Sequence, residues 1–438
     1  MEVFVHRGSE EIGGTCVELR AGGTRVVVDL GMPLVHPDGT RCNSRELEDM
    51  PREELQQRGI LPGVEGLYAW ETPRVDGLLI SHAHQDHYGF LKHVHPDVPV
   101  YMSAGTQKLI EITALIRGKE NPLRNPRQFA WKSDFEVGAF RVTPHLVDHS
   151  AFDAFAFEIE AERKRLFYSG DFRGHGYIAE GAMGRLYRKV TAGVDALMME
   201  GTMLGREEDA VQTEGELSQE ATEVCKQTEG AVLIHQSGQN ITRAVSFYKA
   251  AKRTGRWFVL DVYSAYVLSE LAGLTGGGKL PYPGKPGFDN VRVWYPRFLT
   301  NRLFEKGHED IPYRHQPHKM TKEEMAADLG KVMLFVRPGM ERDLERLGDL
   351  SGSTLIYSLW DGYLEDKGTK DWLDAIRALG VTIKEIHTSG HADIPTLQEM
   401  VSKLAPEKLI PIHTFHADDY ERLFSVPIAE PRGGPYVL

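Results

Sequence analysis

The sequence has little cysteine. Three cysteines, Cys16, Cys42 and Cys225, are scattered over 438 residues without C-x-x-C spacing, which argues against a disulfide framework or a thiolate zinc site and favours a reducing compartment. Long apolar runs are also lacking, and none approaches the ~18 residues needed to cross a bilayer. The N-terminus has no basic region followed by an apolar one. We therefore expect a cytoplasmic protein that does not contact a membrane.

Acidic residues outnumber basic ones overall, but positive charge is concentrated in one stretch. The formal net charge of -12 argues against indiscriminate binding to nucleic acid or anionic lipid. Between residues 242 and 320, however, there are thirteen Lys or Arg and only six Asp or Glu, which predicts a local surface that binds phosphate groups. Among the aromatic residues of this stretch, five are candidates either to stack on bases or to belong to the ordinary core: Tyr248, Trp257, Trp294, Tyr295 and Phe298.

The length suits two domains, or one domain that carries a large insertion. Up to Glu200 the chain reads mainly as short strands separated by glycine-containing turns, among them 2–6, 15–20, 24–30, 155–159 and 196–200. Beyond Glu200 strands and helices alternate, with strands at 231–235, 257–261 and 354–358 and helices at 213–228, 242–254 and 371–379. This alternation predicts an α/β protein whose second half forms a doubly wound, Rossmann-like layer.

Four residues that can bind a metal follow a buried strand expected at 74–81. They form the pattern H-x-H-x-D-H over His82, His84, Asp86 and His87, before a helix expected to start at Phe90. Residues two apart on an extended loop point the same way, so the first two can hold one ion, and the last two can hold a second. Imidazole and carboxylate suit zinc, and also manganese or iron. The alternative is an exposed polar loop with no ligand.

This pattern resembles the signature of the metallo-β-lactamase superfamily. The resemblance implies an αββα sandwich in which His149 of Asp148-His149-Ser150 is a further ligand, although the nearby His145 competes for that role. It also implies that Asp171, in Ser-Gly-Asp-Phe, bridges both ions, and that Asp29 supports the ligands.

The last histidine ligand lies far along the chain. The best match is His413, in Pro-Ile-His, 242 residues beyond Asp171. An insertion of that size resembles the β-CASP branch of the superfamily, which processes nucleic acids. Two more of its motifs are matched by Met-Met-Glu-Gly-Thr around Glu200 and by Thr-Ser-Gly-His-Ala around His391. The expected domains are residues 1–203, the β-CASP insertion at 204–386, and a return to the first domain at 387–438.

The resemblance implies a two-metal-dependent hydrolase of nucleic-acid phosphodiester bonds. We expect a ribonuclease, with single-stranded DNA left open as a second substrate, a metal-bridged hydroxide as nucleophile, two divalent ions as cofactors and zinc favoured over manganese. Asp86, Glu200 and His391 are the expected catalytic residues, with His391 oriented by Glu200 to donate toward the scissile phosphate. RNA or single-stranded nucleic acid is the expected partner, and the sequence leaves open whether the chain forms a homodimer.

Four residues are candidates for substrate contact: Ser237, Arg243, Arg337 and Ser389. Ser237 follows a strand and precedes a helix, where it could cradle a phosphate or could belong to a plain turn and helix cap. In ribonuclease J, a member of the β-CASP branch, a Gln-Gly-Glu run holds the 5′ phosphate. Here the comparable place has Arg-Pro-Gly-Met, which begins at Arg337. Exonuclease action from a 5′ monophosphate therefore does not follow.

Two other functions compete with the nuclease. One is a hydrolase of a small phosphodiester, ester or lactone that uses the insertion as a lid. The other is a nucleic-acid-binding scaffold with a degenerate site, which the sequence disfavours because every expected ligand is present.

Overall fold

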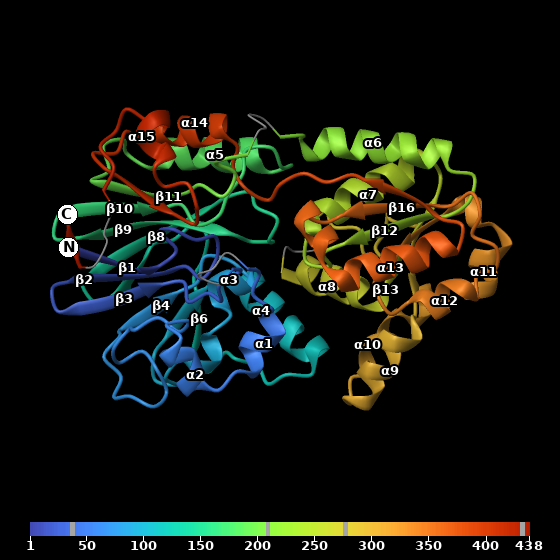
Figure 1. Ribbon diagram of the computed structural model, residues 1–438, viewed down its shortest axis with the longest axis horizontal. Coiled ribbons are helices and arrows are strands. Elements are labelled where there is room, and N and C mark those ends of the chain that lie inside the picture. The colour runs from blue at the N-terminus through green and yellow to red at the C-terminus, as the bar shows by residue number, and fades with distance from the viewer. Residues whose placement is uncertain (36–39, 207–210, 275–278, 430–433) are drawn as a thin grey trace. The chain divides into compact units, whose positions relative to one another are not determined.

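The computed structural model describes residues 1–35, 40–206, 211–274, 279–429 and 434–438 (Figure 1). The chain splits into two compact units. Unit 1 comprises Met1–Ala114, Glu120–Val211 and Gly390–Leu438, and unit 2 comprises Leu115–Lys119 and Gln212–Ser389.

Unit 1 contains two mixed sheets. The first has seven strands in the order β19-β1-β2-β3-β4-β5-β6 and the second six in the order β18-β11-β10-β9-β8-β7, counted over the described residues. The strands of the first sheet are β1 (Glu2–Arg7), β2 (Cys16–Ala21), β3 (Thr24–Val28), β4 (Gly77–Leu79), β5 (Val100–Met102), β6 (Pro126–Gln128) and β19 (Tyr436–Val437). Those of the second are β7 (Phe135–Val137), β8 (Phe140–Leu146), β9 (Phe155–Ala161), β10 (Lys164–Tyr168), β11 (Ala196–Glu200) and β18 (Leu409–Ile412).

The two sheets share one hydrophobic core. Val17 and Leu19 of β2 lie two positions apart and therefore point to the same face, where they belong to one buried cluster with Phe155 and Phe157 of β9 and Ile410 of β18. Burying each such side chain contributes about 1.5–3 kcal/mol. The cluster packs the sheets face to face and so holds the loops at their strand ends in fixed positions.

Helices cover the outer faces. Figure 1 shows α5 (Ala179–Lys189), α14 (Ile394–Leu404) and α15 (Asp419–Leu423) over the second sheet, where Met183, Leu397 and Tyr420 join a second buried cluster. The helices beside the first sheet are α1 (Ser44–Asp49), α2 (Arg52–Gln57), α3 (Gln85–Tyr88) and α4 (Ala104–Arg117). Unit 1 is thus an αββα sandwich.

Unit 2 is built on one all-parallel sheet in the order β14-β13-β15-β12-β16-β17. Its strands are β12 (Val232–Gln236), β13 (Trp257–Asp261), β14 (Val291–Trp294), β15 (Val332–Phe335), β16 (Thr354–Ser358) and β17 (Thr382–Glu385). Its main helices are α6 (Glu214–Gln227), α7 (Ile241–Arg253), α8 (Val262–Leu274), α9 (Arg297–Glu305), α10 (Asp310–His315), α11 (Lys322–Ala327), α12 (Glu341–Glu345) and α13 (Lys367–Ala378). The central strand β12 is buried at every position, as a sheet covered on both faces requires.

The expected α/β class, with an αββα sandwich and a Rossmann-like insertion, is confirmed. The strand order differs from the usual Rossmann order because β15 lies between β13 and β12. The helix expected from Phe90 is only a 3-10 turn, Leu91–His93. The helical turn starts earlier, at Gln85, because the His84 carbonyl accepts the backbone N–H groups of His87 and Tyr88. Within the described ranges, every helix is too short or too polar to cross a membrane.

Candidate metal centre

Loops at neighbouring strand ends of unit 1 bring the candidate ligands together. His82 follows β4, His149 follows β8 and Asp171 follows β10, while Glu200 ends β11 and His413 follows β18. The ligand atoms form groups within which all distances are below 4.8 Å. One group is His82, His84 and His149; a second is Asp86, His87, Asp171 and His413; a third is Asp171, Glu200, His391 and His413.

The first group consists of three imidazoles whose nitrogens face one another. His84 Nδ1 lies 3.0 Å from His149 Nε2. Burial lowers the pKa of His84 to about 4 and that of His82 and His149 well below the usual value, so all three rings are neutral near pH 7. His149 donates from Nδ1 to the Gly390 carbonyl at 2.6 Å, which leaves its Nε2 with a lone pair toward the group.

The second group pairs two carboxylates with two imidazoles. Asp86 Oδ2 lies 3.2 Å from His413 Nε2, and Asp171 Oδ2 lies 3.1 Å from His87 Nε2. Burial would lower the pKa of His87, but Asp171 and Asp29 raise it well above its usual value. A ring held between two carboxylates is protonated in the metal-free chain, and a cation that replaces this proton would meet the same oxygens.

Asp171 connects the groups. Its Oδ2 lies between 3.1 and 4.0 Å from a ring nitrogen of five histidines: His82, His87, His149, His391 and His413. Burial alone would raise the pKa of Asp171, but His413, His87 and His391 lower it well below its usual value. An ionised carboxylate at this junction has the position that a bridging ligand needs.

The residues present fit a divalent cation. Among the described residues, His82 Nε2 and Asp171 Oδ1 are buried atoms with no hydrogen-bond partner, although such atoms are normally satisfied. A set of imidazole nitrogens and carboxylate oxygens is the donor set of zinc and related divalent ions. His413 itself has a left-handed backbone, with φ of 51°, and a non-glycine residue in that conformation is often found at functional sites.

Asp29 holds the ligands without joining a group. Its Oδ1 accepts the Ser81 N–H at 2.8 Å, and its Oδ2 accepts from Ser81 Oγ at 2.8 Å, Tyr168 Oη at 2.6 Å and His87 Nδ1 at 2.8 Å. The last bond fixes the proton of His87 on Nδ1, so that Nε2 faces Asp171.

The buried Glu200 and the half-buried His391 form a pair beside Asp171. His391 Nδ1 lies 3.2 Å from Glu200 Oε2, and the same carboxylate accepts the backbone N–H groups of Phe172, Thr202 and Ala392 at 3.1 to 3.3 Å. Burial would lower the pKa of His391, but Glu200 and Asp171 raise it. The geometry therefore gives Glu200 the means to orient the His391 ring.

The competing ligand candidate, His145, lies in none of these groups among the described residues. Sequence reasoning missed Thr202, whose Oγ1 lies 2.8 Å from His413 Nδ1, as well as Ser81 and Tyr168. Thr202 stands two residues after Glu200 in the Met-Met-Glu-Gly-Thr motif, and that adjacency was the only signal for it.

The four candidates for substrate contact lie in unit 2, in different settings. Ser237 is exposed, and Asn240 rather than Ser237 caps α7 by accepting the Arg243 N–H at 3.0 Å. Arg337 lies beside this turn, because a Cβ on Gly238 would lie 2.7 Å from its Nη2. Arg337 donates to Asp261 Oδ2 at 2.7 Å. Ser389 is half-buried at the end of unit 2.

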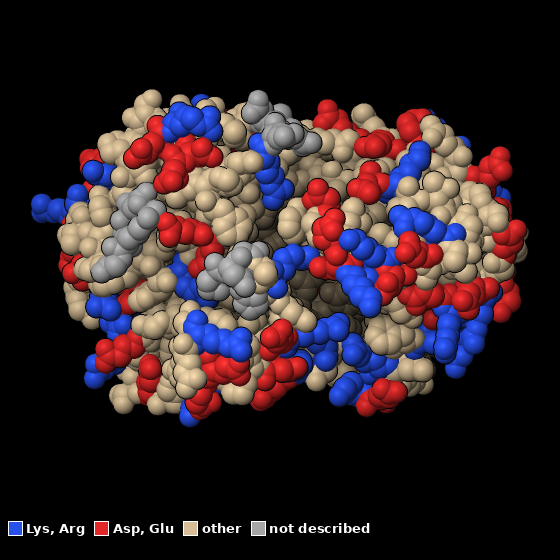
Figure 2. Space-filling view, in the orientation of Figure 1, with Lys and Arg blue, Asp and Glu red and all other residues tan. Residues whose placement is uncertain are grey.

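Arg243 is fully buried, unlike the other three. It donates from Nε to Glu214 at 3.1 Å and from Nη2 to the Thr388 carbonyl at 2.8 Å. Of the aromatic candidates, Tyr248 and Trp294 are core residues, whereas Phe298 is 47% exposed. Figure 2 shows Lys and Arg gathered over the part of unit 2 that contains α9 and α10, so the basic stretch does reach the surface.

Comparison with known families assigns this centre. A model described as a beta-lactamase superfamily domain matches residues 57–236, which include the ligand groups from His82 to Asp171. A second model, a Zn-dependent metallo-hydrolase RNA specificity domain, matches residues 379–426, which include His391 and His413. The chain belongs to the metallo-β-lactamase superfamily. Together with the relatives described next, the second match assigns it to the β-CASP branch, and with the His/Asp groups it indicates a divalent-metal site.

Relatives of this metallo-β-lactamase chain include two proteins named ribonuclease J. That of Sinorhizobium meliloti is 25% identical over 374 residues, which cover 81% of this chain and 61% of the relative. That of Mycoplasma pneumoniae is 25% identical over 425 residues, which cover 94% of this chain and 67% of the relative. The transcription termination factor FttA of Methanothermobacter thermautotrophicus is 23% identical over 472 residues, or 95% of this chain and 67% of that factor.

One solved structure shares the whole fold. The crystal structure of a protein of unknown function from Enterococcus faecalis V583 aligns with a TM-score of 0.79 and 23% identity, over 100% of this chain and 99% of that one. This likeness extends over both units and supports the fold.

Proposed function

We propose that this protein is a metal-dependent nuclease that hydrolyses phosphodiester bonds in RNA and also accepts single-stranded DNA. One observation carries the proposal: Asp171 joins the two ligand groups, and the His391–Glu200 pair lies directly beside that junction. The RNA specificity match and the relatives named ribonuclease J support RNA as the substrate. These matches do not favour a hydrolase of small esters or lactones.

We propose two zinc ions as the cofactors, with manganese as the alternative. His82, His84 and His149 would hold one ion, Asp86, His87 and His413 the other, and Asp171 would bridge them. When bound, two such ions supply charge neutralisation at a phosphate and an activated water.

The residues of the chain position the phosphate and hold a proton. His391 Nδ1 faces Glu200, so Nε2 is the ring nitrogen that we assign to the scissile phosphate and its leaving oxygen. Glu200 cannot turn away, because three backbone N–H groups fix its carboxylate. Ser237, Arg337 and Ser389 would contact the substrate, whereas Arg243 would act through the Thr388 carbonyl that precedes Ser389.

A cleavage assay with matched variants tests the proposal. We expect the zinc-loaded protein to cut end-labelled RNA, and chelation to stop the reaction. Asp86→Ala should lose metal and activity together, whereas His391→Ala should keep its metal and lose about 10²- to 10⁴-fold in rate, as for other general acids. Intact RNA and single-stranded DNA under all metal and salt conditions, with turnover of a chromogenic phosphodiester, would instead favour a small-molecule hydrolase.

We also propose the domain boundaries and the homodimer that were considered from the sequence. The domain boundaries 203/204 and 386/387 can be tested by limited proteolysis, and the homodimer by sedimentation velocity.

A further inference from the structure

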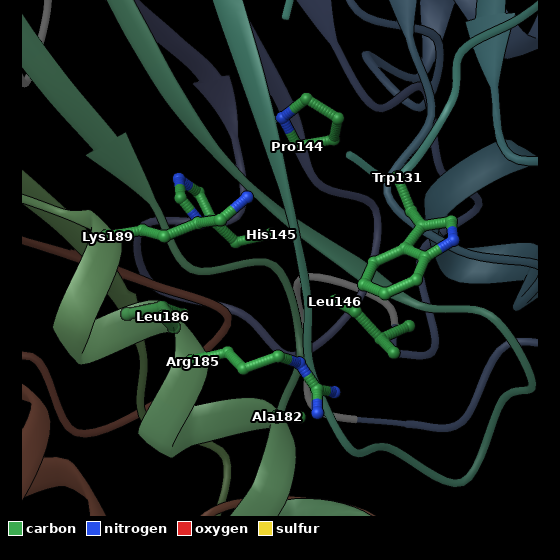
Figure 3. A pocket seen from close by; sticks show the side chains of 8 residues that line it. All are labelled: Trp131, Pro144, His145, Leu146, Ala182, Arg185, Leu186 and Lys189. Carbon is green, nitrogen blue, oxygen red and sulfur yellow. The ribbon is translucent and has the colours of Figure 1, made fainter. Parts of the chain in front are cut away.

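A shallow pocket on unit 1 has chemistry that the metal centre does not use. It lies between β8 and α5, beside the loop that carries Trp131, and is lined among others by Trp131, His145, Leu146, Arg185 and Lys189 (Figure 3). Arg185 reaches from α5 toward Trp131. No residue of the ligand groups lines this pocket, so it is a separate feature.

The pocket combines an exposed aromatic face with positive charge. Trp131 is 45% exposed. Lys132 Nζ lies 4.4 Å and Arg185 Cζ 5.9 Å from the centre of its ring. Within the described ranges, Lys132, Arg185 and Lys189 form no ion pair. A cation without a carboxylate partner, next to an exposed indole, is suited to a ligand that carries both an anion and a flat ring.

His145 of β8 lines the same pocket. It is only 4% exposed, and its Nε2 has no hydrogen-bond partner among the described residues. Glu158 Oε2 lies 3.5 Å from this nitrogen, and the other oxygen of that carboxylate, Oε1, lies 3.5 Å from Arg165 Nη1. The ring packs against Phe167, with 5.7 Å between ring centres. His145 thus supplies a buried part of the pocket wall, and the exposed groups of the pocket are Trp131, Arg185 and Lys189.

We propose that this pocket binds one nucleotide of a single-stranded nucleic acid, outside the metal centre. Trp131 stacks on the base, while Arg185 and Lys189 hold the adjoining phosphate. The inference extends the proposed nuclease function, because a second contact would anchor the strand that the metal centre cuts. An acidic peptide would satisfy the cations but would not need the indole face, so the chemistry favours a nucleotide.

The test measures binding separately from cleavage. A fluorescent oligonucleotide with 2′-O-methyl and phosphorothioate linkages resists hydrolysis, and its affinity for the full-length, zinc-loaded protein is read by anisotropy over a range of salt concentrations. Trp131→Ala should weaken binding about tenfold without changing the salt dependence, because stacking releases no counterions. Trp131→Phe should keep most of the affinity.

Charge loss at the pocket should have a different signature. Arg185→Ala should make the slope of log K against log salt less steep by about 0.7, the value for one phosphate contact on a single strand. Arg188→Ala is the matched control, because it removes the same charge from the exposed side of the same helix but does not line the pocket. Trp360→Ala removes an indole of similar exposure, 40%. Both controls should bind within about twofold of the wild type.

Each outcome decides between clear alternatives. If Trp131→Ala and Arg185→Ala bind the oligonucleotide as tightly as the two controls, the inference is wrong. It is also wrong if Trp131→Ala and Trp131→Phe lose the same affinity. Displacement of the oligonucleotide by an acidic peptide, with Trp131→Ala unaffected, would make the pocket a protein-docking surface instead. If the wild type binds through Trp131 but does not cleave RNA, the proposed nuclease function fails while the nucleotide site stands.

Discussion

Asp29 should control metal affinity although it touches no metal. Its backbone has a φ of 58°, a conformation that asparagine also tolerates, so Asp29→Asn changes the charge with little backbone strain. The asparagine oxygen can still accept the Ser81 N–H. Its amide nitrogen, however, replaces the oxygen that now accepts from Ser81 Oγ, Tyr168 Oη and His87 Nδ1.

The imidazole is the partner that cannot adapt without cost. The two hydroxyl groups can rotate and accept from the new amide. To accept a hydrogen bond from the new amide, His87 Nδ1 must give up its proton. The proton then lies on Nε2, the atom that is 3.1 Å from Asp171 Oδ2. A protonated Nε2 cannot bind a metal. Loss of such a supporting bond typically costs 10- to 100-fold in metal affinity, or about 1.4–2.7 kcal/mol.

Competition with a chromophoric chelator measures this loss. Asp153→Asn is the matched control, because Asp153 also has a left-handed backbone, with φ of 61°, and its Oδ2 accepts a backbone N–H, that of Gly105, at 2.9 Å. It belongs to none of the ligand groups. Both variants should lose some stability, but only Asp29→Asn should lose metal affinity. Unchanged zinc affinity in Asp29→Asn would refute the tautomer argument.

Four further predictions follow from the same contacts. Removing metal with a chelator should lower the melting temperature and abolish cleavage, and adding zinc should restore both. Glu200→Gln should lower kcat about 10- to 100-fold with metal content unchanged, because it loses a charge-assisted bond to His391 worth about 1.5–3 kcal/mol. Burial lowers the pKa of His235 to about 4, below the unfolded value near 6.5, so the stability of unit 2 should fall as the pH drops from 6.5 to 4. The loss reaches at most about 3 kcal/mol, and the urea midpoint of His235→Phe should lack this part of the decrease. Arg243→Ala should destabilise unit 2 by about 3–5 kcal/mol in urea unfolding, because it leaves Glu214 buried without its partner.

Local patterns carried most of the fold that could be predicted. The strands at 196–200, 257–261 and 354–358 coincide with β11, β13 and β16, because each is a short apolar run bounded by turn residues. The order of the parallel strands was not accessible, because which strands pair depends on contacts between segments far apart in the sequence. The inclusion of Leu115–Lys119 in unit 2 likewise has no local signal.

The candidate site was accessible to the extent that motifs mark strand ends. His82 to His87 are adjacent in the chain, whereas His413 could be placed beside them only through the resemblance to a known family. The supporting contacts were harder. The bond of Tyr168 Oη to Asp29 joins residues 139 positions apart, and a tyrosine in an apolar strand gives no sign that its hydroxyl will meet a carboxylate.

Arg243 and Trp131 show that a charge pattern in the sequence can suggest a substrate contact where there is none and can miss an exposed site. Arg243 stands in a basic, amphipathic helix, a setting in which arginine normally contacts solvent or phosphate, yet Glu214 of the preceding helix neutralises it in the core. Trp131 lies in a loop of an acidic chain and belongs to no motif, yet it is exposed with two cations near its ring. Whether a charge binds a substrate depends on what else lies within about 4 Å of it. That neighbourhood is set by packing between distant segments, so the binding surface is the part of this function that only the folded chain reveals.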